Sequence, residues 1–128
     1  MDMRNEARSP LAVRRDDPGD IGRFHFLEEG LSFGRRALDV AATEGADLVI
    51  VDEFGRLELA SRGWRSAVDS LVHAGKRPLL IVVRREWAGE VQEVYADVPS
   101  RVLDAAGPDS VHEVISLLKY NRAARKIG

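Results

Sequence analysis

Apolar residues follow two spacings along the chain, one typical of strands and one of helices. Between residues 10 and 27, two short apolar alternations flank the turn-forming segment DDPGD at residues 16–20, and this pattern predicts a β-hairpin. Residues 28–44 carry apolar side chains at helical spacing and are followed by Gly45, so we expect a helix that ends at that glycine.

Two uninterrupted apolar runs follow, DLVIV at residues 47–51 and LLIVV at residues 79–83. Such runs are typical of strands that are covered on both faces, as in parallel sheets. A third short strand is expected at residues 101–103. Helices are expected between and after these strands, at residues 62–74 (closed by Gly75), at residues 86–95, and from Ser110 onward.

The last helix shows a capping-box pattern, Ser110 to Glu113. Its expected buried face consists of Val111, Val114, Ile115 and Leu118. Because helices alternate with strands, the fold class is α/β. We expect a mainly parallel three-layer sheet with helices on both faces, preceded by the hairpin. We also expect residues 1–128 to form a single domain, with residues 1–8 disordered.

Composition narrows the class of protein. The chain has 128 residues, 45% hydrophobic and 31% charged, with 19 Lys and Arg against 21 Asp and Glu. This near-neutral balance argues against nucleic acid as a partner. The basic residues after position 118 instead complement the dipole of the last helix.

Cysteine is absent, which excludes disulfide scaffolds and fits a cytoplasmic location. Neither a signal peptide nor the roughly 18-residue apolar run of a membrane span is recognisable.

Charged residues follow each expected strand of the parallel sheet: Asp52 and Glu53, then Arg84 and Arg85, then Asp104. Ligands of open α/β sheets bind at this edge. An aliphatic run that leads into two acids is the Walker B pattern, in which the first carboxylate holds hydrated Mg²⁺ and the second orients a water. Alternatively, the acids mark only the point where a strand emerges into solvent.

A longer string makes the first interpretation more specific. VDEFGRLEL at residues 51–59 resembles the Walker B segment of the thermophile-type nucleoside-triphosphatase family of P-loop NTPases. Supporting similarity extends over roughly residues 9–118. The resemblance implies a P-loop-NTPase-like fold and Mg²⁺-dependent hydrolysis of a nucleoside triphosphate, ATP or GTP, to the diphosphate and phosphate.

The resemblance also implies roles for individual residues. Asp52 would be the Mg²⁺-associated carboxylate and Glu53 the catalytic base. Arg84 stands where a cation would contact the γ-phosphate and offset transition-state charge. The alternative for Arg84 is a solvated residue that closes a strand.

The loop after the two acids carries three further candidates. Gly55 is expected to permit a tight loop or a positive φ. Glu58 matches an acid of the family pattern and, with Arg56, is a candidate for nucleotide binding. The alternative is that Glu58 braces the loop by pairing with Arg56.

One family feature is missing from the sequence. P-loop NTPases hold phosphates with GxxxxGK(S/T) after a strand, whereas the only Gly-Lys pair here, at residues 75–76, precedes a strand. The first strand and P-loop of the family fold are thus not recognisable, so the chain alone is expected to bind nucleotide weakly and to be inactive. Truncation, a split subunit and a diverged domain all fit. The rival function is a non-catalytic interaction domain that uses the exposed sheet edge to bind itself or a partner chain.

Overall fold

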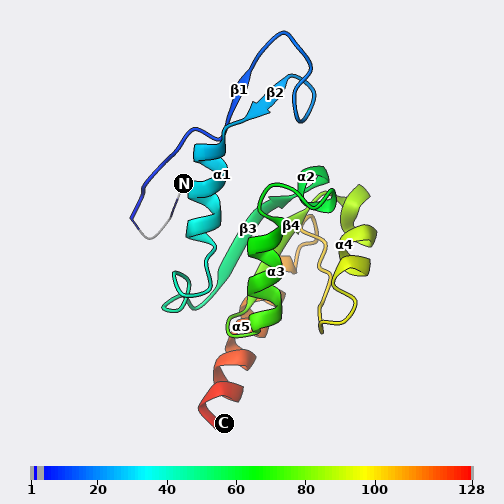
Figure 1. Ribbon diagram of the computed structural model, residues 1–128. Helices are drawn as coiled ribbons and strands as arrows, with labels where there is room; N and C mark the ends of the chain where they lie inside the picture. The colour runs from blue at the N-terminus through cyan, green and yellow to red at the C-terminus, as the bar shows by residue number, and fades with distance from the viewer. Residues whose placement is uncertain (1, 3–4, 128) are drawn as a thin grey trace.

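The computed structural model describes residue 2 and residues 5–127, which form an α/β structure (Figure 1). Strands β1 (Ala12–Arg14) and β2 (Phe24–Phe26) pair antiparallel as the expected hairpin. Strands β3 (Val49–Phe54) and β4 (Leu79–Val83) pair in parallel. The prediction of an α/β class with an N-terminal hairpin is therefore confirmed.

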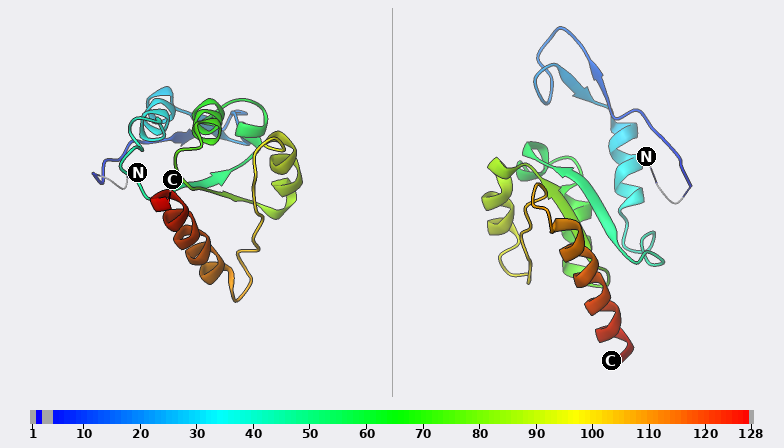
Figure 2. Two further views of the ribbon diagram at one scale, coloured as in Figure 1. Left: turned by 90° about the horizontal axis from the view of Figure 1, so that it is seen from below. Right: turned by 180° about the vertical axis from the view of Figure 1, so that it is seen from behind.

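The helices lie on both sides of the β3–β4 sheet. Helices α1 and α3 lie on one side of the sheet, and α5 crosses the other side (Figure 2). A 3₁₀ turn, η1, leads directly into α4. The helical elements are α1 (Glu28–Ala37), α2 (Arg56–Leu59), α3 (Arg65–Ala74), η1 (Arg85–Trp87), α4 (Ala88–Val94) and α5 (Ser110–Ile127).

The core lies on the face of the sheet that α3 and α4 cover. Its buried members are Val51, Phe54, Val68, Val91 and Tyr95. Phe54 is fully buried, and its ring meets Tyr95 edge-on at a centroid distance of 6.1 Å. Large aromatic side chains provide much of the apolar area in a small core, so Phe54 and Tyr95 are central to joining β3 to α4.

The other face of the sheet is partly open, in contrast to the expectation of burial on both faces. Ile50 on β3 is 54% exposed and Val82 on β4 is 41% exposed. Although α5 crosses this side (Figure 2), two of the four residues expected on its buried face are exposed, Val111 at 70% and Ile115 at 44%. The expected buried face of α5 is therefore wrong at Val111 and Ile115, whereas Val114 and Leu118 are half-buried.

The predicted strand at residues 101–103 does not form. These residues have no ladder partner, and Val102 is 57% exposed. Directly after them the Oδ1 of Asp104 accepts the N–H of Ala106 at 3.0 Å and forms a local turn. In the described part of the chain, the parallel sheet therefore consists of β3 and β4.

Two predicted helix boundaries are wrong. The helix expected over residues 28–44 ends at Ala37, because the Oδ1 of Asp39 accepts the N–H groups of Ala41 and Ala42 at 2.9 and 3.3 Å and favours a turn. The helix expected from residue 62 begins at Arg65.

The expected capping box of α5 is also absent from its described residues. The N–H of Glu113 donates to the carbonyl of Asp109, and Ser110 Oγ donates to Ala105. Ser110 is the first residue of the helix.

Other predicted boundaries are confirmed. Strand β4 spans residues 79–83 as expected, and Gly75 ends α3 in the left-handed region at φ 58°. The expected disorder of residues 1–8 falls partly on residues 1, 3 and 4, which lie outside the described residues. Among the described helices, none is both long and apolar enough to cross a membrane.

Two glycines allow α1 to fit between its neighbours. A Cβ at Gly30 would lie 2.3 Å from the carbonyl oxygen of Pro10, and one at Gly34 would lie 2.2 Å from Nε1 of Trp64. Residues four apart lie on one face of a helix. That face of α1 therefore contacts the chain entering the hairpin at one end and the α2–α3 loop at the other.

Candidate active site

A β-bulge turns both acids of the Walker B pattern outward. Val51 pairs with Ile81 and Phe54 with Val83, so two residues of β3, Asp52 and Glu53, stand opposite one residue of β4. In a regular strand, side chains alternate between faces, and only one of the two acids would point outward. Here Val51 and Phe54 are both buried, while the two acids are exposed at the end of the strand. Bulges often re-aim side chains in this way beside active sites.

The backbone of Glu53 is held in an unusual conformation. Its φ is 70°, in the left-handed region that non-glycine residues rarely adopt. Of the two alternatives for Gly55, a tight loop or a positive φ, the positive φ is wrong, since Gly55 has φ −142° and precedes α2. The strained position therefore lies two residues earlier, at the candidate base.

Each arginine that follows β4 pairs with an acid. Arg84 Nη2 donates to Glu53 Oε1 at 2.9 Å, and Arg85 Nη2 donates to Asp104 Oδ2 at 2.6 Å. Glu53 and Arg84, both predicted as site residues, are thus in direct contact across the sheet. Their side chains are 64% and 69% exposed, so both can be reached by a ligand in solution.

Glu58 braces the loop after β3. It is 6% exposed, and its Oε2 accepts the N–H of Gly55 at 3.0 Å while its Oε1 accepts the N–H of Trp64 at 3.4 Å. The bracing alternative therefore has structural support through backbone N–H groups instead of through Arg56, which is exposed on α2. Glu58 holds the two ends of the α2 segment at fixed positions beside the bulge.

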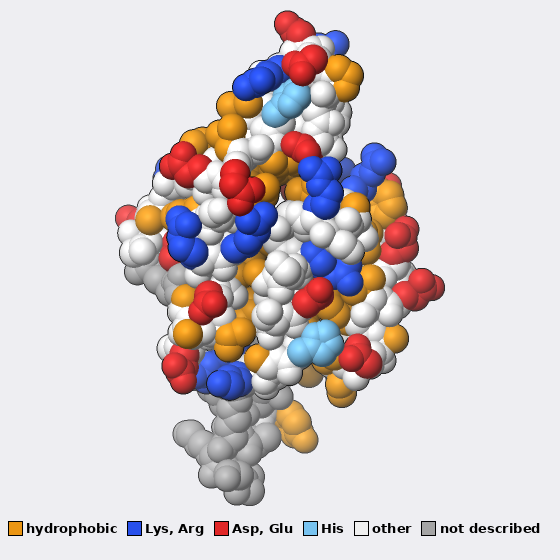
Figure 3. Space-filling view, viewed as in Figure 1, with side chains coloured by type: hydrophobic (Ala, Val, Ile, Leu, Met, Phe, Trp, Pro, Cys, Tyr) orange, Lys and Arg blue, Asp and Glu red, His pale blue; other side chains and the backbone are white. Residues whose placement is uncertain are grey.

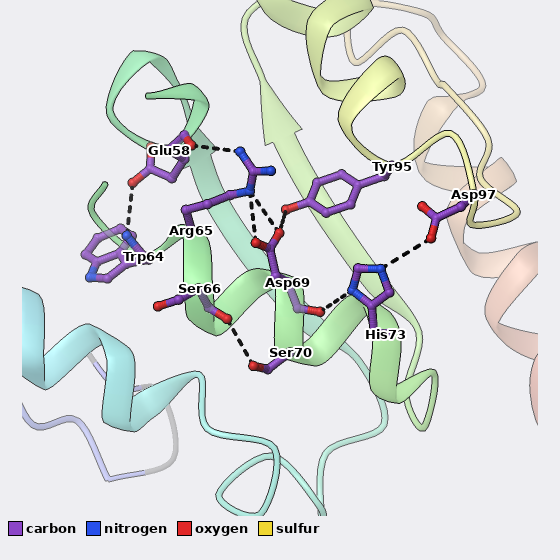
Figure 4. Close-up of polar contacts among 9 residues, drawn as sticks. All are labelled: Glu58, Trp64, Arg65, Ser66, Asp69, Ser70, His73, Tyr95 and Asp97. Atoms are coloured by element: carbon purple, nitrogen blue, oxygen red, sulfur yellow. Dashed lines mark hydrogen bonds and ion pairs between the residues drawn. The ribbon is translucent and has the colours of Figure 1, made fainter. Parts of the chain in front are cut away.

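A polar network joins α3 to the residues that directly follow α4 (Figure 4). Arg65 Nε and the hydroxyl of Tyr95 donate to Asp69 Oδ1 at 2.9 and 2.8 Å. Burial and the bond to Asp69 raise the pKa of Tyr95. His73 contacts the carbonyl of Asp69 at 2.8 Å and the carboxylate of Asp97 at 3.3 Å, which raises the pKa of His73. The spacing of Arg65, Asp69 and His73, four residues apart on one helix, is the sequence signal that would have indicated this network.

A polar cleft of about 320 Å³ lies between α1 and the α2–α3 loop. Arg35 borders it from α1, and its guanidinium binds Glu28 at 2.7 Å and the carbonyl of Gly63 at 3.4 Å. Arg62 borders it from the loop and pairs with Asp20 of the hairpin. Basic and acidic side chains are interspersed over this face (Figure 3). Sequence reasoning did not find this cleft, because its lining comes from segments far apart in the chain.

The strain at Glu53 gives a stability prediction. A left-handed φ costs a non-glycine residue about 1–2 kcal/mol of folding free energy. A glycine at the same position lowers the free energy of unfolding by about 0.4–1 kcal/mol, because it has greater freedom in the unfolded chain. Both Glu53→Gly and Glu53→Ala remove the ion pair with Arg84. We therefore expect Glu53→Gly to unfold with a free energy about 1 kcal/mol higher than Glu53→Ala, measured by urea denaturation. A less stable glycine variant would contradict strain at this position.

Comparison with known proteins supports one family. A model of the NTPase family matches residues 1–115. The chain is 29% identical over 122 residues to a protein of Thermotoga maritima named nucleoside-triphosphatase THEP1, covering 91% of this chain and 69% of that protein. A protein of the same name from Methanocaldococcus jannaschii is 31% identical over 84 residues, which are 65% of this chain and 48% of that protein. No solved structure matches. The family model spans most of the chain, including the bulge with Asp52 and Glu53 and the strand end at Arg84. This protein therefore belongs to the NTPase family.

Proposed function

We propose that this chain carries the metal-binding and water-activating part of an enzyme that hydrolyses a nucleoside triphosphate to the diphosphate and phosphate. The observation that supports it most directly is the bulge that exposes Asp52 and Glu53 together at the end of β3. The relatives named nucleoside-triphosphatase give the substrate class. The α/β arrangement is consistent with a P-loop-NTPase-like fold. We further propose that the sheet is mainly parallel and is the middle of three layers, with helices on both faces.

The proposed roles follow from where the side chains stand. Glu53 accepts the proton of the attacking water as general base. Arg84, whose guanidinium reaches the same region from β4, binds the γ-phosphate and offsets charge in the transition state. Glu58 acts indirectly, because it fixes the loop after the bulge. Arg56, exposed on α2, is kept as a candidate for contacting the nucleotide.

Asp52 is the residue that would hold Mg²⁺. Its exposed carboxylate is a hard oxygen donor of the kind that Mg²⁺ prefers. This ion usually binds one or two carboxylates, several waters and substrate phosphates instead of an all-protein cage. The described residues contain no group of three or more His, Cys, Asp and Glu side chains able to hold a metal ion. Bound there, Mg²⁺ would neutralise charge on the transferred phosphoryl group.

The phosphate cradle is the part that this sequence does not contain. Phosphates in P-loop enzymes are held by backbone N–H groups and a lysine of GxxxxGK(S/T), which is absent from the 128 residues. We therefore propose that the chain is inactive alone and hydrolyses nucleotide only once a segment that carries this motif is supplied. We also propose that it acts in the cytoplasm.

The test is to supply that segment. A strand–GxxxxGK(S/T)–helix segment is fused ahead of Met1, and phosphate release from Mg·ATP and Mg·GTP is measured against the unfused chain. We expect hydrolysis only in the fused protein. Without the segment, calorimetry should show affinities no better than about millimolar, where roughly 4 kcal/mol of binding free energy is available. Micromolar binding by the unfused chain would contradict the proposal.

A second candidate function has its own observation. Ile50 on β3 and Val82 on β4 are exposed apolar residues of the sheet, and exposed apolar patches often mark interaction sites. A non-catalytic domain that binds itself or another chain there would show no hydrolysis even in the correctly folded fused protein, and this result separates the two functions.

A further inference from the structure

We propose that the ion pair between Glu53 and Arg84 is a latch that phosphate opens: an incoming polyphosphate takes Arg84 from Glu53, and phosphate binding thereby raises the fraction of Glu53 that is unpaired. This inference rests on the proposed function, since it assigns a regulatory contact to the two residues of that site.

The first observation is that the pair connects the two strand ends. Arg84 Nη2 lies 2.9 Å from Glu53 Oε1, with Glu53 at the end of β3 and Arg84 directly after β4. The proposed base and the proposed phosphate-binding cation are therefore paired with each other in the ligand-free protein.

The second observation is that the pair has little value for stability. Both side chains are more than 60% exposed, and solvent-exposed ion pairs contribute little to folding. Yet Glu53 keeps a left-handed backbone conformation, φ 70°, and strain of this kind is concentrated at functional sites. The strain and the weak pair together are better explained by a contact that must open than by one that holds the fold together.

The third observation is chemical. The planar guanidinium of arginine matches phosphate oxygens as well as it matches a carboxylate, and it binds them in a bidentate manner. A polyphosphate carries several negative charges against the single charge of Glu53. The exchange of Arg84 from carboxylate to phosphate is therefore favourable. It couples the presence of substrate to the freeing of Glu53.

The neighbouring pair provides a matched control. Arg85 Nη2 donates to Asp104 Oδ2 at 2.6 Å, and these side chains are 83% and 58% exposed. Asp104→Asn removes one negative charge beside one arginine, as Glu53→Gln does, but it leaves Arg84 and Glu53 in contact.

The experiment uses the 128-residue chain and inorganic tripolyphosphate, without Mg²⁺ or nucleoside, at low ionic strength, where surface charges are least screened. Binding is followed by NMR titration into the millimolar range for wild type, Glu53→Gln, Arg84→Gln, the double variant and Asp104→Asn. Freeing Arg84 should tighten tripolyphosphate binding of Glu53→Gln by about two- to fivefold, the value of one exposed pair.

The Arg84→Gln, double and Asp104→Asn variants show whether this gain in affinity comes from the release of Arg84. We expect Glu53→Gln to give no gain when Arg84 is already glutamine, and Asp104→Asn to gain less than Glu53→Gln. The backbone amide signal of Glu53 should shift on titration of the wild type and stay in place in Arg84→Gln. An unchanged affinity of Glu53→Gln, or the same gain in the Arg84→Gln background, would overturn the latch. Because no hydrolysis is measured, a failed activity test of the fused protein leaves this result standing, and a failed latch leaves that activity untouched.

Discussion

Glu53→Gln in the protein fused to a P-loop segment is expected to lower kcat by about 10²–10⁴, the usual loss when a general base is removed. The amide has the size of the carboxylate but cannot accept the proton of water. Nucleotide affinity should not fall, since phosphate is anchored elsewhere. Phosphate release under saturating Mg·ATP measures the first effect, and calorimetry measures the second.

The controls for this experiment come from neighbouring acids. Glu86 is an exposed acid two residues beyond Arg84, and Glu86→Gln should leave kcat within about twofold, since surface substitutions away from a site have small effects. Asp52→Asn should lower kcat and also weaken the Mg²⁺ dependence. If Glu53→Gln keeps kcat within about threefold of the wild type, Glu53 is not the base, and Glu58 becomes the next carboxylate to test.

Phe54→Ala is expected to lower the free energy of unfolding by about 3–5 kcal/mol, the range observed when a buried phenylalanine is truncated. Phe54, the last residue of β3, is fully buried and packs against Tyr95, so the alanine variant loses apolar burial and leaves a cavity. Chemical denaturation, followed by far-ultraviolet circular dichroism, measures the loss. A cost this large would leave a domain of ordinary stability close to unfolding.

Ile50→Ala is the matched control, because Ile50 is on the same strand and points to the opposite, open face. With Ile50 54% exposed, its truncation should cost about 1 kcal/mol or less. Equal costs for the two variants would mean that the open face is covered in solution, by self-association or by another part of the fold.

The elements that sequence predicts well are those with a local cause. The apolar run and flanking turn signals are sufficient for β4, and Gly75 ends α3 through its own backbone freedom. The predicted strand at residues 101–103 fails because a strand needs a partner, and the three residues Arg-Val-Leu cannot show whether a partner is near. The helix after the hairpin is too long in the prediction, because the turn at Asp39 depends on a side-chain hydrogen bond that competes with an otherwise helical apolar spacing.

The sequence indicates candidate residues for a site, but it does not indicate how they are arranged in space. The Asp-Glu pair after an aliphatic run indicates Asp52 and Glu53, and Arg84 follows from its place after the next strand. The bulge follows from the burial of Phe54 together with Val51, a tertiary requirement. The same requirement explains the positive φ at Glu53, where residue type alone would favour Gly55.

Helix α1 is a poor helix by its own sequence, and this has a consequence for how the protein folds. Its ten residues include Gly30 and Gly34, and each glycine inside a helix costs about 0.5–1 kcal/mol relative to alanine. Isolated helices of this length are marginal in water even with better sequences. Residues 28–37 should therefore become helical only once Pro10 and Trp64 lie against the two glycines. The hairpin, α1 and the α2–α3 loop then behave as one cooperative unit that opens and closes together. Local unfolding at the base of the hairpin would therefore also loosen the packing of Trp64. Trp64 lies in the loop that Glu58 braces beside the two acids.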